Sequence, residues 1–218
     1  MKSVLIVGAG QFGMHIAKRM AESRCEIMVV DSEEERINTI LPYATNAQIG
    51  DSTNAEFMRS LGIPDYDVCI VTISDSFQDS LETTALLKEL GARKVISRAQ
   101  NDVQEKFLLR NGADETVYPE KQTAVRLAIK EASDDILDVF QLDHEINIYE
   151  VRVPETWSGK TIAELNLRKK YHLNIITVRK SNQLVVPMPD MELLSDESIL
   201  LIGNMKDIQK AFSKYRVI

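Results

Sequence analysis

Short apolar runs alternate with amphipathic stretches from the start of the chain to residue 133. The runs are rich in β-branched residues, as in Val4-Leu5-Ile6-Val7, which is typical of strands buried on both faces. Between the runs, apolar residues recur at helical spacing, and Leu81, Leu86 and Leu90 mark one such face. This alternation predicts an α/β fold with a doubly wound parallel sheet. The predicted strands are 4–7, 26–30, 47–49, 68–72, 94–97 and 116–118. The first predicted helix follows residue 13, and the later ones are 33–41, 55–61, 75–90, 103–110 and 119–132.

The pattern changes after Ser133-Asp134-Asp135, where we place a domain boundary. Residues 146–153 alternate between two faces as a half-buried strand does, and Ser181-Asn182-Gln183 is typical of a hairpin turn. We therefore predict a first domain over residues 1–134, its last helix included, and a small α+β domain over residues 135–218. The predicted strands of the second domain are 146–153, 174–179, 184–186 and 198–202, and its predicted helices are 161–171 and 205–215.

The segment after the first strand is Gly8-Ala9-Gly10-Gln11-Phe12-Gly13, a G-x-G-x-x-G motif between a strand and a helix. In this motif the first glycine allows a tight turn, and the second lets the backbone approach a pyrophosphate. The third lets the helix pack on the strand. Free N–H groups and the positive end of the helix dipole then face the phosphates. All six residues are therefore predicted to form a nucleotide site in a Rossmann-type sheet.

Asp31 ends the second predicted strand, where this fold places an acid that accepts hydrogen bonds from ribose hydroxyls. Such an acid repels a 2′-phosphate and favours a non-phosphorylated ribose, while capping the next helix is the alternative role. Ligands of open α/β sheets lie outside the carboxyl ends of the strands. For Arg98, which follows the fifth strand, a phosphate contact and a plain surface charge both stay open. The rule adds to the predicted site Ser32, Gly50, Asp51, Ser52, Thr72, Ile73, Ser74 and Arg98.

Composition narrows the function further. The 218 residues include 44% hydrophobic and 27% charged side chains, as expected for a packed globular protein. The net charge of −7 argues against a nucleic-acid partner, which requires a basic face. No apolar run approaches the roughly 20 residues that span a bilayer, and no signal peptide precedes the first strand. We therefore expect a cytoplasmic protein that cannot itself form a membrane pore. Cys25 and Cys69 indicate neither a disulfide framework nor a zinc site.

No catalytic constellation accompanies the predicted nucleotide site. A hydride-transferring enzyme needs a proton donor or acceptor beside the nicotinamide, and no His–Asp or Lys–Tyr pairing stands out in the sequence. A nucleotide site without a chemical site favours sensing, in which the ligand shifts the population of two conformers. An NAD-dependent oxidoreductase with a small substrate domain stays open as the alternative. A redox-sensing repressor is a third possibility, although no basic helix-turn-helix is apparent.

Further segments, together with the glycine motif and Asp31, form a recognisable set. The first domain adds Gly50-Asp51-Ser52-Thr53, Arg98-Ala99-Gln100-Asn101, Gly112-Ala113-Asp114 and Tyr118-Pro119-Glu120-Lys121. The second domain adds the segments 157–168, 174–176 and 196–203. With these segments in this order, the chain resembles the regulatory subunits of Trk/Ktr-type potassium uptake systems (TrkA/KtrA-like) over essentially its whole length. These proteins are built on RCK, or KTN, domains.

The resemblance implies a cytosolic, nucleotide-sensing subunit that gates a membrane potassium-translocating subunit (TrkH/KtrB-like). Such proteins form dimers and rings of dimers, and they lie at the inner face of the cell membrane through their partner. The family's nucleotides are NAD(H) or ATP/ADP, bound at the glycine turn. KtrA-like members often carry an arginine at the position of Gln11, where it can reach a terminal phosphate. Gln11 is neutral, as in TrkA-like members, so we favour NAD(H), with ATP/ADP as the alternative.

The resemblance also suggests two further sites. Glu120 matches a family acid proposed to hold a divalent cation at the dimer interface, although an acid there also suits the start of a helix. In the second domain a set of residues is similar to the cyclic di-AMP site of some members, where Arg168 would pair with a phosphate and Asn174 would hydrogen-bond a base. Ala163 and Asn166 depart from that pattern, and the apolar members would be core residues in any case. The set is Ile162, Leu165, Arg168, Asn174, Ile175 and Ile176.

Overall fold

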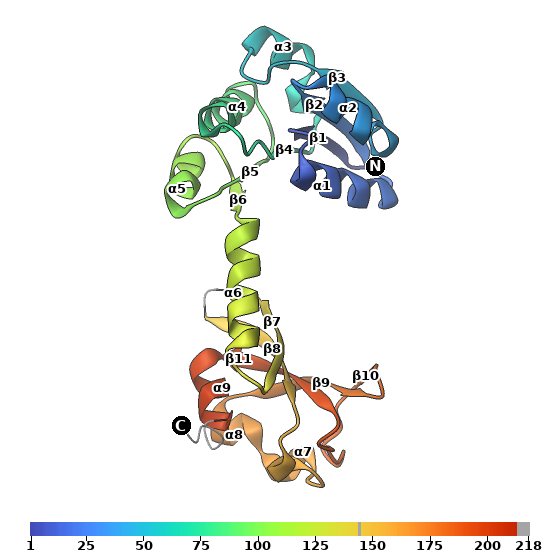
Figure 1. Ribbon diagram of the computed structural model, residues 1–218, viewed down its shortest axis with the longest axis vertical. Helices are drawn as coiled ribbons and strands as arrows, with labels where there is room; N and C mark the ends of the chain where they lie inside the picture. The colour runs from blue at the N-terminus through green and yellow to red at the C-terminus, as the bar shows by residue number, and fades with distance from the viewer. Residues whose placement is uncertain (144, 213–218) are drawn as a thin grey trace. The chain divides into compact units, whose positions relative to one another are not determined.

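The structure of the protein is a computed structural model that describes residues 1–143 and 145–212. The chain divides into two compact units, the first over Met1–Glu120 and the second beginning at Lys121. Figure 1 shows the elements of each unit, coloured along the chain. Each unit has its own buried core.

The first unit is built on a six-stranded sheet in the order β3-β2-β1-β4-β5-β6. Every pairing in this sheet is parallel. The chain order therefore reverses between β1 and β4, which makes the carboxyl end of these two strands the topological switch point. The strands are β1 (Ser3–Val7), β2 (Glu26–Asp31), β3 (Asn46–Ile49), β4 (Val68–Val71), β5 (Val95–Arg98) and β6 (Glu115–Val117).

Helices cover both faces of this sheet, as the apolar runs predict. Leu5 and Val7 of β1 belong to one core cluster, while Val4 and Ile6 belong to another on the opposite face. Because the strand is buried on both faces, it has no polar side. The expected doubly wound α/β fold is confirmed. The helices of this unit are α1 (Gln11–Glu22), α2 (Glu34–Ile40), α3 (Ala55–Ser60), α4 (Phe77–Glu89) and α5 (Asp102–Arg110), with short 3-10 turns at Leu41–Tyr43 and Ile63–Asp65.

Helix α6 (Pro119–Glu131) begins at the end of the first unit and continues into the second. The second unit contains a five-stranded antiparallel sheet in the order β10-β9-β11-β8-β7. Its core includes the buried side chains of Tyr149 and Trp157, and the Trp157 ring lies 5.2 Å from that of Phe212. The remaining elements are β7 (Ile136–Gln141), β8 (Ile146–Arg152), a 3-10 turn (Glu155–Trp157), α7 (Ile162–Leu165), α8 (Leu167–Tyr171), β9 (Asn174–Lys180), β10 (Gln183–Val185), β11 (Ser198–Asn204) and α9 (Met205–Phe212).

The second unit differs from the sequence prediction in its details. Strand β7 was not predicted, because a register shift between Ile136 and Asp138 interrupts the alternation that marks a strand. The predicted helix over residues 161–171 is two short helices, separated by Asn166 in the left-handed region at φ 48°, which asparagine tolerates. Of the predicted helix over residues 205–215, residues 213–215 lie outside the described part of the chain.

The boundary between the units falls earlier than the predicted domain boundary at residues 134 and 135. Most of α6, which we assigned to the first domain, belongs to the second compact unit. Its Ile129 packs against the core of that unit. The Arg126 guanidinium also binds the Asp138 carboxylate of β7 through Nε at 2.7 Å. The contacts of the last turns of α6 therefore attach them to the second sheet.

Candidate functional site

A cleft of about 150 Å³ lies at the carboxyl end of the parallel sheet, where the chain order reverses. It collects residues that follow four neighbouring strands, as the rule for open α/β sheets requires. Ten of the residues predicted from the sequence line it: Gly8, Gly10, Asp31, Ser32, Gly50, Asp51, Ser52, Thr72, Ile73 and Ser74.

The glycine turn after β1 is locked to the end of β4. Gly8 has φ +104°, and a Cβ atom placed on it would lie 2.8 Å from Thr72 Oγ1. The Thr72 hydroxyl donates to the carbonyl oxygen of Gly8 at 2.6 Å. A Cβ atom on Gly13 would collide with the same carbonyl oxygen, whereas one on Gly10 would meet nothing within 4 Å. Packing thus requires two of the three glycines, while Gly10 leaves the backbone open toward the cleft.

Gly10 is the N-cap of α1 and makes no side-chain capping bond. The N–H groups in the first turn of a helix have no acceptor within the helix, and the positive end of the helix dipole adds to their attraction for anions. Gly10 leaves this end of the helix accessible from the cleft. The turn is therefore suited to receive the phosphates of a nucleotide.

Asp31 joins the ends of β1 and β2. Its carboxylate accepts a hydrogen bond from the backbone N–H of Ala9 at 2.7 Å and another from the backbone N–H of Glu33 at 2.9 Å. The residue is only 6% exposed. Asp31 therefore organises the glycine turn and the start of α2 while its carboxylate lines the cleft.

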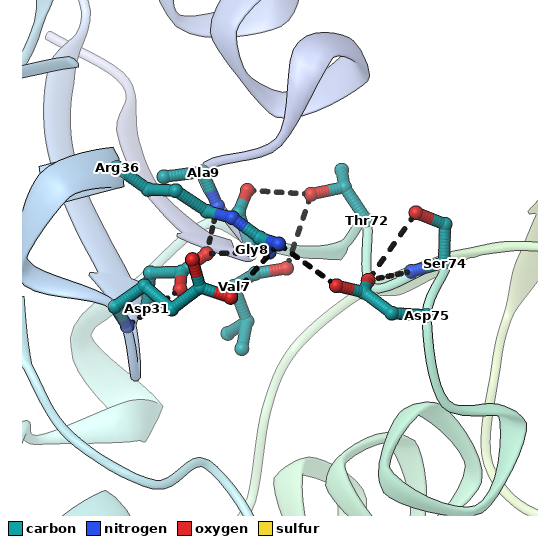
Figure 2. A network of polar contacts seen from close by, with 9 residues as sticks. Val7, Gly8, Ala9, Asp31, Arg36, Thr72, Ser74 and Asp75 are labelled. Carbon is teal, nitrogen blue, oxygen red and sulfur yellow. Dashed lines mark hydrogen bonds and ion pairs between the residues drawn. The ribbon is translucent and has the colours of Figure 1, made fainter. Parts of the chain in front are cut away.

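Arg36, from α2, connects the two sides of the cleft. Its Nη2 atom lies 2.9 Å from Asp75 Oδ2 and 2.9 Å from Glu33 Oε1, and its Nη1 atom lies 3.8 Å from Asp31 Oδ2. Figure 2 shows this network beside the turn at Gly8. The hydrogen bond to Asp75 is the main reason that the pKa of Arg36 is raised, and in return Arg36 lowers the pKa of Asp75.

The far side of the cleft comes from the segment after β3. Gly50 donates its backbone N–H to the carbonyl oxygen of Asp31 at 2.9 Å, and a Cβ atom on Gly50 would collide with the ring of Phe57. The Ser52 hydroxyl is buried and lies 2.7 Å from Thr83 Oγ1 of α4. Asp51 is exposed, and hydrogen bonds from the backbone and side chain of Thr53 lower its pKa.

Five predicted residues do not line the cleft: Ala9, Gln11, Phe12, Gly13 and Arg98. Ala9 takes part through its bond to Asp31, and Gly13 through packing. Gln11 is the exposed first residue of α1. The Arg98 guanidinium lies 5.5 Å from the centre of the Phe12 ring and forms an ion pair with Glu120. The Arg98 side chain is only 15% exposed, so it is not a plain surface charge, and its contact with a phosphate stays a prediction.

The cleft also contains polar residues that sequence reasoning missed. These are Glu33, Arg36, Asp75, Ser76 and Asp79. Ser76 is the N-cap of α4, and its Oγ accepts a hydrogen bond from the backbone N–H of Asp79. Arg36 lies five residues after Asp31 in the sequence. This closeness to the predicted ribose-binding acid could have indicated that Arg36 reaches the cleft. Its partner Asp75 follows a different strand, and no local pattern links the two.

Glu120, predicted as a possible metal ligand, directs its carboxylate to Arg98. Partial burial opposes ionisation of Glu120, but its own backbone N–H and Arg98 lower its pKa overall. Within residues 1–143 and 145–212, no group of three or more His, Cys, Asp or Glu side chains could hold a metal ion. The metal role of Glu120 stays a prediction.

A second cleft, of about 290 Å³, lies in the second unit between α7, α8 and the start of β9. Four of the residues predicted for a second ligand line it, namely Ile162, Arg168, Asn174 and Ile175. Leu165 is instead buried in the core, and Ile176 is exposed outside the cleft lining. The left-handed residue Asn166, between the two short helices, also lines the cleft.

Family models match both units of the chain. The TrkA-N domain matches residues 4–119 and the TrkA-C domain matches residues 148–215. The chain is 35% identical over 210 residues to the Ktr system potassium uptake protein C of Bacillus subtilis, covering 96% of this chain and 95% of that protein. It is 32% identical to the Ktr system potassium uptake protein A of the same organism, with the same coverage.

Solved structures share the fold. One described as the GsuK channel bound to NAD superposes with a TM-score of 0.70 at 19% identity, over 96% of this chain and 38% of that chain. At that identity the likeness establishes the fold alone. In the described part of the present chain, every helix is too short or too polar to cross a membrane.

Proposed function

This chain belongs to the family of proteins with TrkA-N and TrkA-C domains, and on that premise we propose that it is the nucleotide-sensing regulatory subunit of a potassium uptake system. The observation that carries the proposal is the cleft at the switch point, in which an open glycine turn and a buried Asp31 face the same space. Relatives named as potassium uptake proteins match along nearly the whole chain. Ligand binding in this cleft would favour one conformer and so change the activity of the partner.

We assign no enzymatic reaction to the cleft. Among the described residues, its lining contains no histidine, lysine, cysteine or tyrosine, which are common proton donors and acceptors in catalysis. Asp75 is held ionised by Arg36, and Asp31 accepts two backbone hydrogen bonds. These contacts support a binding site over the alternative of an oxidoreductase.

The charges of the cleft favour NAD(H) over ATP. Its lining includes the carboxylates of Asp31, Glu33, Asp51, Asp75 and Asp79, and Arg36 is the single cation among the described lining residues. An acidic cleft repels a ligand more strongly as the ligand's negative charge increases. ATP carries more negative charge than NAD(H), and Gln11 provides no positive charge at the turn. We therefore propose NAD(H) as the ligand, bound at the residues predicted from the sequence, with ATP/ADP as the competing nucleotides.

The partner would be a membrane potassium-translocating subunit of the TrkH/KtrB type, with this chain attached at the inner face of the membrane. Copies of the chain would assemble as dimers and as a ring of dimers. Size-exclusion chromatography with light scattering measures the assembly. A protein that stays monomeric at all concentrations would contradict this part of the proposal.

The decisive test of the function is reconstitution with such a membrane subunit in vesicles. We expect the two proteins to copurify and the potassium flux to change when NADH or NAD is added. A complex whose flux ignores NADH, NAD, ATP and ADP alike would overturn the proposal. Nicotinamide turnover by the chain alone would support the oxidoreductase instead.

The second cleft is proposed to bind cyclic di-AMP. The supporting observation is that Arg168 and Asn174, a cation and an amide able to contact phosphate and base, line the same depression with Ile162 and Ile175. Arg168 is exposed and lies one residue into α8. Its guanidinium is suited to bind a phosphate with two parallel hydrogen bonds.

A further inference from the structure

The ion pair between Arg36 and Asp75 crosses the phosphate-binding turn. Asp31 ends β2, Asp75 follows β4, and β1 lies between these two strands in the sheet. Arg36, which lies within 3.8 Å of Asp31, also reaches Asp75 at 2.9 Å. The arginine must therefore pass the end of β1, where the glycine turn begins, and Figure 2 shows it doing so beside Gly8.

This position coincides with the path of a nucleotide's phosphates. In a sheet of this type, the ribose lies at the end of β2 and the pyrophosphate at the start of the helix after β1. The cleft measures about 150 Å³ with the ion pair in place, whereas ligand pockets are commonly about 300–1,000 Å³. A nucleotide that contains a pyrophosphate can therefore bind here only if the guanidinium moves or becomes part of the binding site.

We propose that Arg36 exchanges anionic partners, so that the guanidinium leaves Asp75 and binds the pyrophosphate when a nucleotide enters the cleft. This inference rests on the proposed nucleotide site. It identifies Arg36 as a residue that determines which ligands that site accepts. Asp75 is the competitor: its side chain is 57% exposed, so it loses little when the arginine departs and water replaces the contact. Glu33 and Asp31 keep the arginine near the cleft during the exchange.

The exchange predicts opposite effects for the two partners. Removing the charge of Asp75 abolishes the competition and strengthens phosphate binding, whereas removing Arg36 deletes the phosphate ligand and weakens it. A hydrogen bond to a charged group contributes about 1.5–3 kcal/mol, which corresponds to an affinity change of roughly tenfold or more. Adenosine has no phosphate, so its affinity should respond to neither change.

The test is calorimetric titration of the full chain with adenosine, ADP and NADH. We expect Asp75→Asn to tighten the binding of ADP and NADH by about threefold or more, and Arg36→Gln to weaken it by about tenfold. Adenosine should change by less than about twofold in both variants. In the double variant, Asp75→Asn should add no gain, because Arg36, the cation for which Asp75 competes with the phosphates, is already gone. Arg36→Lys, which keeps the charge but loses the paired N–H groups, should fall between wild type and Arg36→Gln.

A matched control pair exists in the same unit. Asp67 accepts a backbone N–H from Ser3 at 2.9 Å and binds Arg93 at 3.1 Å, much as Asp75 binds Ser74 and Arg36. Neither control residue lines the cleft. Asp67→Asn and Arg93→Gln should leave all three affinities unchanged.

The outcomes separate the inference from the function on which it rests. Wild-type protein that binds none of the three probes would overturn the nucleotide site and the exchange together. Wild-type protein that binds ADP or NADH, with Asp75→Asn unchanged or weaker, would overturn the exchange alone. So would tighter binding by Arg36→Gln, because it would make the arginine an obstacle and not a ligand.

Discussion

The backbone N–H of Ala9 donates a 2.7 Å hydrogen bond to the buried carboxylate of Asp31. This contact joins the turn after the first strand to the end of the second. The residue expected to recognise a ribose therefore also holds the turn that receives the phosphates. Substitutions at Asp31 should consequently affect stability and nucleotide binding together.

Asp31→Asn should destabilise the first unit by about 1–3 kcal/mol, the cost of leaving a buried N–H without an acceptor. The asparagine side chain has one carbonyl oxygen in place of two carboxylate oxygens, so the N–H groups of Ala9 and Glu33 cannot both keep their partners. Urea unfolding followed by circular dichroism measures the loss. Asp31→Ala removes both acceptors and should cost more. Equal stability of wild type and both variants would show that this bond does not support the turn.

Two glycines of the turn should respond differently to the same change. Gly13→Ala places a methyl group against the carbonyl oxygen of Gly8, and overpacking of this kind costs about 1–3 kcal/mol. Gly10→Ala meets no atom within 4 Å, so its stability should fall by less than about 1 kcal/mol, the usual scale of an N-cap change. Its methyl group would still stand in the path of the pyrophosphate.

Thermal unfolding and NADH titration of the two variants test this contrast. Gly10→Ala should be folded and deficient in NADH binding, whereas Gly13→Ala should be deficient in stability. If Gly10→Ala binds NADH as wild type does, the phosphates do not approach the backbone at Gly10.

Gln11 offers a test of the choice of nucleotide. Gln11→Arg adds a positive charge at the exposed start of α1, so it should strengthen binding of ATP more than binding of NADH. We expect the ratio of the ATP to the NADH affinity to rise by about tenfold, the scale of one charge-assisted hydrogen bond. Gln183→Arg, on the exposed β10 of the second unit, is the control for net charge. Wild-type protein that already binds ATP as tightly as NADH would contradict our assignment of the ligand.

The second unit should lose stability in acid through Glu150. Its carboxylate binds Arg179 Nε at 2.7 Å and the Ser198 hydroxyl at 2.7 Å, and Arg179 is the main reason that its pKa lies below the ordinary value of 4.5. A carboxyl whose pKa is lower in the folded state stabilises the fold above its unfolded pKa. That stabilisation is lost as the pH falls below about 4.5 through the folded pKa.

Trp157 is the single tryptophan of the chain and lies in the core of the second unit, so its fluorescence reports the unfolding of that unit. Glu150→Gln should be less stable than wild type at pH 7, and the difference should shrink as the pH is lowered below 4.5. The exposed Glu155 provides the control Glu155→Gln. A difference in stability that stays constant with pH would show that ionisation of Glu150 does not stabilise the fold.

Arg168→Ala should abolish cyclic di-AMP binding and leave NADH binding intact, because the two clefts belong to different units. Lys170→Ala, on the same helix but outside the lining of the second cleft, is the matched control. Titration of each variant with both ligands measures the separation. Absence of cyclic di-AMP binding to the wild-type chain would end this assignment.

The sequence by itself determined the features that depend on local pattern. The two-sided apolar runs specify buried parallel strands, because a strand with no polar side must be covered on both faces. The glycine motif placed the turn correctly, since Gly8 must adopt a positive φ and Gly13 must pack against backbone. The position of Asp31 also follows from a local pattern, because this residue directly follows the second apolar run.

Only the tertiary structure decided which side chains meet across the ends of different strands. Arg36 and Asp75 are brought together because β2 and β4 flank β1, an order that no local spacing encodes. The same reason explains why Arg98 contacts Phe12 and Glu120 and not the cleft. In the second unit, the irregular register of β7 accompanies a strand that was not predicted, and the left-handed Asn166 divides a predicted helix into two.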